Sequence, residues 1–138
     1  MNSLLVDTSF LVALYDRTDL HHERCARAHE EYDEPLVTCE AVVTESLHLL
    51  RRVPGAARAI LASIEKGILA IPFRLSEKAA AVAAILDKYR DLPASLADAC
   101  LIHMADQLDT GDIFTLDADF KHYRWRRNRA FRLLIPLE

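Results

Sequence analysis

The chain has 138 residues, of which 51% are hydrophobic and 28% charged, a composition typical of one globular domain with a sizeable core. Its formal net charge of -4 gives no overall attraction to nucleic acids or acidic membranes. The three cysteines are scattered and form no C-x-x-C pair, which argues against a disulfide framework or a zinc knuckle. The first residues lack a leader pattern, and no apolar run reaches membrane-spanning length. We therefore expect a single domain over residues 1–138 in a reducing cytoplasm.

Short apolar runs alternate along the chain with longer segments of helical spacing. In chain order we expect a strand at 3–6, a helix starting at 10–15, a helix at 22–32, a strand at 36–38, helices at 40–52 and 54–67, a strand at 68–73, helices at 76–89 and 95–108, and strands at 113–116 and 131–137. Thr8 or Ser9 is the expected cap of the first helix. Strands separated by helices predict an α/β fold in three layers, with a mainly parallel sheet of about five strands flanked by helices.

Two acids directly follow predicted strands. Asp7 ends the opening run "LLVD", and Asp117 stands in the same relation to "IFTLD". In open α/β sheets, ligands bind outside the carboxyl ends of the strands, so the two carboxylates could meet at one rim of the sheet. Taken singly, each is equally well explained as a loop residue or a helix cap, because Asp favours such places.

Two further acids lie on predicted helices. Glu45 shares a helix face with Ala41 and Leu49, so it borders the apolar stripe. Asp98 follows Ser95 at the spacing of a capping box, in which an acid of the first turn stabilises the helix start. Capping and ligation are compatible in position, because the first turn is also where a helix meets the strand rim.

Carboxylates that are brought together repel one another and do not all stay ionised unaided. A hard divalent cation, Mg²⁺ or Mn²⁺, resolves this repulsion, because it prefers oxygen ligands and shares its coordination with water and phosphates. Such an ion can orient a water for attack on phosphorus. Paired carboxylates also serve glycoside hydrolysis, so the acids alone do not select the chemistry.

Four stretches carry a resemblance to a known family: "VDTSFLVALYDRTDLHH", "VVTESLHLL", "DLPASLADACLIHMAD" and "IFTLDADFKHYR". In this order they resemble the signatures of PIN-domain ribonucleases, and most of all the VapC toxins of toxin–antitoxin pairs. The resemblance covers nearly the whole chain and implies a PIN-like fold. It implies that the catalytic and metal-binding acids are Asp7, Glu45, Asp98 and Asp117, with Asp119 as a further candidate ligand. Supporting hydroxyls are then expected at Thr8, Ser9 and Thr115.

The function that this resemblance implies is a metal-dependent endoribonuclease that uses Mg²⁺ or Mn²⁺ and acts as a toxin. Water is then the nucleophile, and the products carry 5′-phosphate and 3′-hydroxyl ends. The implied partners are an RNA substrate, a VapB-type antitoxin and a second copy of the chain. Leu11, Val12, Leu14 and the apolar stripe of the 40–52 helix either pack in the core or in part line a groove for the antitoxin. The alternatives are an RNA-processing nuclease and a catalytically silent binding module.

The segment "HYRWRRNRAFR" combines arginines with Tyr123 and Trp125. Arginines among aromatic residues suit RNA, because they can bind phosphates while bases stack on the rings. The alternative is a solvated loop whose cations balance acidic neighbours. The candidate RNA contacts are Arg124, Arg126, Arg127 and Arg129.

Overall fold

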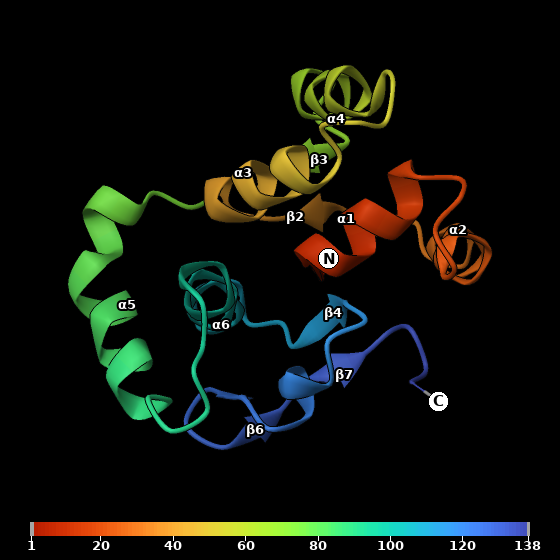
Figure 1. Cartoon of the computed structure of the whole chain (residues 1–138). Helices are drawn as coiled ribbons and strands as arrows, with labels where there is room; N and C mark the ends of the chain where they lie inside the picture. Colours follow the sequence, from red (N-terminus) through yellow and green to blue (C-terminus); the bar gives the residue numbers. More distant parts are fainter. Residues whose placement is uncertain (1, 138) are drawn as a thin grey trace.

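A computed structural model describes residues 2–137 and shows a three-layer α/β arrangement (Figure 1). The elements, in chain order, are β1 (Leu4–Val6), α1 (Thr8–Tyr15), α2 (His22–Glu30), β2 (Leu36–Val37), α3 (Glu40–Leu49), α4 (Ala56–Glu65), β3 (Leu69–Ala70), α5 (Leu75–Lys88), α6 (Leu96–Leu108), β4 (Asp112–Phe114), the 3₁₀ helix η1 (Ala118–Lys121), β5 (Arg124–Trp125), β6 (Arg129–Ala130) and β7 (Arg132–Leu133). The predicted α/β fold with a parallel sheet is confirmed.

The main sheet has five strands in the order β3-β2-β1-β4-β7, and every neighbouring pair is parallel. β1 lies at the centre, and its three residues are fully buried. This burial explains its unbroken apolar sequence, because helices cover both faces of such a strand. Figure 1 shows α1 and α2 on one side of the sheet and α5 and α6 on the other. The carboxyl ends of β1 and β4 therefore lie side by side, and Leu5 pairs with Ile113 in register.

The first helix begins at Thr8, two residues earlier than predicted, and its cap is Asp7 rather than Thr8 or Ser9. Asp7 has an extended backbone, and its carboxylate accepts a hydrogen bond from the Thr8 N–H. The strand therefore passes into the helix through a single acidic residue. This acid caps the helix and at the same time stands at the end of β1.

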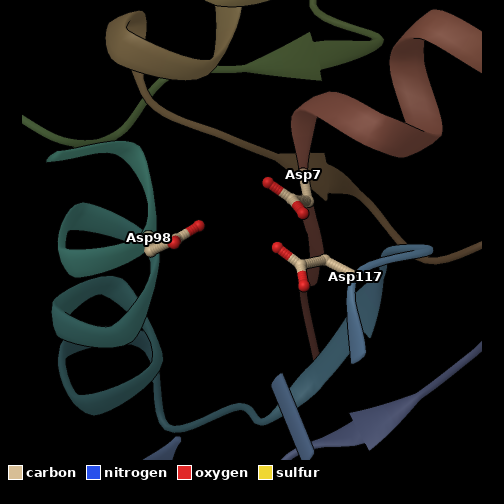
Figure 2. A group of neighbouring side chains, drawn as sticks. All are labelled: Asp7, Asp98 and Asp117. Atoms are coloured by element: carbon tan, nitrogen blue, oxygen red, sulfur yellow. The ribbon is translucent and has the colours of Figure 1, made fainter. Parts of the chain in front are cut away.

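The helix α6 begins as its sequence predicts. Ser95 is the cap, its hydroxyl accepts from the Asp98 N–H, and the Asp98 carboxylate accepts from the Ser95 N–H, which completes a capping box. Most of this helix is buried, and Asp98 near its start faces Asp7 and Asp117 (Figure 2). Asp98 is thus positioned at the sheet rim by local sequence.

Three short elements, η1, β5 and β6, were not predicted. The segment expected as a loop forms a small antiparallel hairpin of β5 and β6, in which Trp125 lies opposite Arg129. The last strand is shorter than predicted, because only Arg132 and Leu133 pair with β4. Within residues 2–137, no helix is both long and apolar enough to cross a membrane.

Candidate active site

Asp7 stands at the end of β1 and is 4% exposed. Its Oδ1 accepts from the Thr8 N–H at 2.8 Å, and its Oδ2 accepts from the Thr115 hydroxyl at 2.7 Å and the Ser9 hydroxyl at 3.4 Å. Burial, with a smaller contribution from Asp98, raises the pKa of Asp7 to about 7, although the Thr115 hydrogen bond opposes this shift. The side chain is therefore fixed in orientation but costly to ionise without a nearby cation.

Asp98 contributes from the first turn of α6. Its Oδ2 accepts from the Ser95 N–H and from the Tyr123 hydroxyl, both at 3.1 Å. Burial is the main cause that raises the pKa of Asp98. Among the described residues no donor bonds to Oδ1, so one oxygen of Asp98 serves the capping box and the other is available to a ligand.

Asp117 follows β4 and caps η1. Its Oδ1 accepts from the Asp119 N–H at 2.9 Å, and its own N–H donates to the Thr115 hydroxyl at 3.0 Å. Thr115 thereby connects Asp7 with Asp117, since its hydroxyl donates to one and accepts from the other. A single buried hydroxyl sets the spacing of two of the acids.

The three aspartates converge from β1, α6 and the end of β4 (Figure 2). Each offers one carboxylate oxygen, and these three oxygens lie within 4.8 Å of one another. An all-oxygen donor set of this size suits a hard divalent cation such as Mg²⁺. The Thr8 hydroxyl oxygen also fits such an ion or its water, because it is buried in the same recess and has no hydrogen-bond partner in the described part of the chain.

The remaining predicted acids lie close by but outside this cluster. Glu45 on α3 and Asp119 on η1 line the same recess, which has a volume of about 410 Å³. Glu45 is exposed and Asp119 half-buried. The structure thus brings five predicted acids to one recess and draws three of them, Asp7, Asp98 and Asp117, into direct proximity.

The predicted hydroxyls differ in their roles. Thr115 and Ser9 both donate to Asp7, and Ser9 also accepts from the Leu116 N–H at 2.9 Å. Thr8 supports Asp7 through its backbone N–H only. Sequence reasoning did not find the contact of Tyr123 with Asp98. The available signal was that Tyr123 lies in "IFTLDADFKHYR", one of the stretches that carry the family resemblance.

The four candidate arginines lie at the β5–β6 hairpin, and none of them lines the recess that holds the three aspartates. Arg126 contacts Asp106 and Asp109 near the carboxyl end of α6, whereas Asp98 is at its amino end. The guanidinium of Arg124 donates to the carbonyls of Lys121 and Tyr123. The structure therefore does not bring the arginines into the acidic recess.

Comparisons with known proteins agree with this architecture. The chain is 28% identical over 116 residues to Ribonuclease VapC26 of Mycobacterium tuberculosis, a match that covers 83% of this chain and 86% of the relative. The fold is similar to the crystal structure of Mycobacterium tuberculosis VapC20, described as a sarcin–ricin loop cleaving toxin, with a TM-score of 0.78. That likeness covers 86% of this chain and 93% of the other at 23% sequence identity. The PIN domain family model matches residues 4–126, and the chain therefore belongs to the PIN domain family.

Proposed function

We propose that the chain is a divalent-metal-dependent endoribonuclease and the toxin of a VapBC-type toxin–antitoxin pair. The observation that carries the proposal is the convergence of the oxygens of Asp7, Asp98 and Asp117 within 4.8 Å. Membership of the PIN domain family and the resemblance to a ribonuclease support RNA as the substrate. The related toxin VapC20 cleaves the sarcin–ricin loop, so an RNA that contains this loop is the first candidate substrate.

The residues that would hold Mg²⁺ or Mn²⁺ are Asp7, Asp98 and Asp117, and the bound ion supplies an activated water and neutralises charge on phosphate oxygens. Glu45 and Asp119 line the recess beside these three, and we retain them as carboxylates that contact the ion or its water ligands. Five acids around one recess would repel an RNA phosphate if no cation were bound. We therefore expect activity to depend strictly on the divalent ion.

Hydrogen bonds from surrounding residues orient the aspartates before any ligand binds. Thr115 and Ser9 hold Asp7, while Ser95 and Tyr123 hold Oδ2 of Asp98. Asp7 and Asp98 thereby each accept a hydrogen bond from a residue distant in the sequence, Thr115 and Tyr123 respectively, whereas Asp117 accepts one from the nearby Asp119 N–H. Such preorganisation lowers the cost of ordering the ligands at the moment of binding.

In the proposed reaction, the oxygen of a water molecule bonds to phosphorus while the bond from phosphorus to the 3′ oxygen breaks. The 3′ oxygen leaves as a hydroxyl, so the products carry 5′-phosphate and 3′-hydroxyl ends. A route in which the 2′-hydroxyl of the RNA attacks would need a nearby base, usually histidine. Among the described residues that line the recess, there is neither histidine nor lysine, which favours water as the nucleophile.

The decisive experiment incubates the purified protein with structured RNAs, including one with the sarcin–ricin loop, in Mg²⁺, in Mn²⁺ and in a chelator. We expect cleavage only with a divalent ion, and 5′-phosphate ends when the cut sites are mapped. Cleavage that persists in the chelator, or products that carry 2′,3′-cyclic phosphates, would contradict the proposed mechanism.

The toxin role includes an antitoxin partner, a homodimer and action in the cytoplasm. Leu11 is buried in the core, whereas Leu49 on α3 and Leu61 on α4 are 54% and 51% exposed. Leu61 lines a hollow of about 820 Å³ beside α4, and we assign an apolar helix of the antitoxin to this hollow. Induced expression of the chain alone should slow cell growth, and co-expression of an antitoxin encoded upstream of it should restore growth. Harmless expression of an active enzyme would favour the alternative of an RNA-processing nuclease.

A further inference from the structure

The β5–β6 hairpin is fixed to the carboxyl end of α6. The Arg126 N–H donates to a carboxylate oxygen of Asp106, and the Arg126 guanidinium lies 3.4 Å from Asp109. A cation is favourable at this place, because the carboxyl end of a helix carries partial negative charge. Asp106 is about 12 Å from Asp98 along the helix axis, at 1.5 Å per residue. The hairpin is therefore anchored at a separate place from the acidic recess.

The arginines of this region differ in whether their side chains are paired with a carboxylate. Arg126 is engaged by two aspartates, and Arg132 forms two hydrogen bonds of 3.0 Å with Asp112. Arg127 and Arg129 are exposed, and within residues 2–137 neither forms an ion pair. Arg129 lies over the ring of Trp125, 5.3 Å from its centroid. Two guanidinium groups thus remain available to a ligand from solution.

The backbone conformation of the turn at Arg126 and Arg127 is unfavourable for arginine. Arg126 and Arg127 have φ angles of 44° and 70°, in the left-handed region that glycine and asparagine adopt more readily. The Asn128 N–H closes the turn by donating to the Arg126 carbonyl at 2.9 Å. Arginine therefore occupies two positions at which the backbone alone favours a smaller residue, and the anchoring of Arg126 explains only one of them.

We propose that Arg127 and Arg129 form an exosite for RNA phosphates, separate from the acidic recess, so that the substrate is an RNA long enough to reach both. This inference rests on the proposed ribonuclease function. The chain has a net charge of -4, so its affinity for RNA must come from local cations. Guanidinium groups suit this task, because their planar set of donors matches a phosphate, and the Trp125 ring holds one of them in place.

Binding of a fluorescent RNA is measured across a series of salt concentrations in the Asp98→Asn protein, in which we expect no cleavage. The test variant carries Arg127→Gln and Arg129→Gln in addition. The matched control carries Arg52→Gln and Arg58→Gln, which remove the same charge from exposed positions before α4 and on it. We expect the slope of log affinity against log salt to fall by about 1.4 in the test variant, at roughly 0.7 per phosphate contact with a single strand. The control should keep the original slope.

Cleavage of RNAs of graded length gives a second readout in the active protein. We expect the two hairpin substitutions to raise KM for long RNAs and to leave kcat, and the cleavage of the shortest RNAs, unchanged. An unchanged salt slope, or an equal loss for short and long RNAs, would overturn the exosite. If the unsubstituted protein cleaves no RNA with any divalent ion, the proposed function fails instead, and the binding result still decides whether the hairpin contacts RNA.

Discussion

The Tyr123 hydroxyl donates a hydrogen bond to Oδ2 of Asp98 across 3.1 Å, and this bond joins the segment after η1 to the first turn of α6. Tyr123 is fully buried, and its ring contacts those of Tyr89 and Phe120 at centroid distances of 5.0 Å. Burial and the neighbouring Asp98 raise the pKa of Tyr123, so its hydroxyl stays protonated and acts as a donor. Tyr123 is thus a positioning residue for one of the three clustered aspartates.

The first prediction concerns Tyr123→Phe, which removes this hydroxyl and keeps the ring. Asp98 should then lose a fixed orientation, and the affinity for Mn²⁺ should fall by about 10- to 100-fold, as is usual when a partner of a metal ligand is removed. Direct titration of the protein with Mn²⁺ measures this affinity without reference to activity.

Tyr89→Phe is the matched control for this prediction. The Tyr89 hydroxyl accepts from the Arg124 N–H at 2.8 Å, and its ring packs against Tyr123, but no hydrogen bond connects it with Asp98. This variant should lose some stability and keep the Mn²⁺ affinity of the original protein. Equal Mn²⁺ affinity in both variants would show that the Tyr123 bond has only a structural role.

The second prediction concerns Asp98→Asn. All hydrogen bonds that the Asp98 side chain accepts go to Oδ2, so the carbonyl oxygen of asparagine can take over that position. The amide nitrogen then replaces Oδ1 and cannot bind a cation. We expect the thermal unfolding midpoint to stay near its original value while Mn²⁺ binding and RNA cleavage are lost. A large drop in the midpoint would instead assign Asp98 mainly to the capping box.

The order of the elements is predictable from this sequence, because apolar spacing changes visibly between strands and helices. The start of α6 is also predictable, since Ser95 and Asp98 form their capping box within one turn. The lengths of the strands are less predictable. The strand β3 ends at Ala70, before the predicted end at Phe73, because its only neighbour β2 has two residues. An edge strand can pair only along the length of its neighbour, and the residues of β3 themselves carry no information about the length of β2.

The candidate site likewise has some features that the sequence predicts and others that it does not. Asp7 and Asp117 each follow a strand, so their meeting at one rim follows from the parallel sheet. The bond between Tyr123 and Asp98 depends on tertiary packing, which spacing along the chain does not encode. The β5–β6 hairpin was missed because each strand has only two residues and the turn lacks the usual Asn-Gly signal.

The third prediction concerns stability against pH in the metal-free protein. The pKa of Asp7 is raised from 3.8 to about 7, so the folded chain holds a proton that the unfolded chain has already lost. The free energy of unfolding should therefore fall as pH rises from about 4 to about 7, by at most about 1.4 kcal/mol per pH unit from this group. Urea unfolding at several pH values in a chelator measures this slope.

The Asp7→Asn variant isolates the contribution of that carboxyl group. Asparagine does not titrate, so the variant should show a smaller decline of stability with pH, whatever its absolute stability. Addition of Mn²⁺ to the original protein should restore stability most strongly near pH 7, because the cation favours the ionised carboxylate. If the original protein and the variant decline in parallel, Asp7 is not the group that takes up the proton.

The last prediction concerns Gly111, which precedes β4 and lies against the indole of Trp125. A Cβ at this position would stand 2.1 Å from Nε1 and 2.6 Å from Cε2 of that ring. The ring cannot easily move aside, because it is buried and its Nε1 donates to the Ala130 carbonyl at 3.2 Å. Gly111→Ala should therefore lower the free energy of unfolding by about 1–3 kcal/mol through overpacking. In a Trp125→Ala background the same substitution should cost much less, because the obstructing ring is gone. Urea unfolding of both single variants and the double variant measures this coupling, and strictly additive losses would show that the contact between Gly111 and Trp125 does not hold the hairpin against β4.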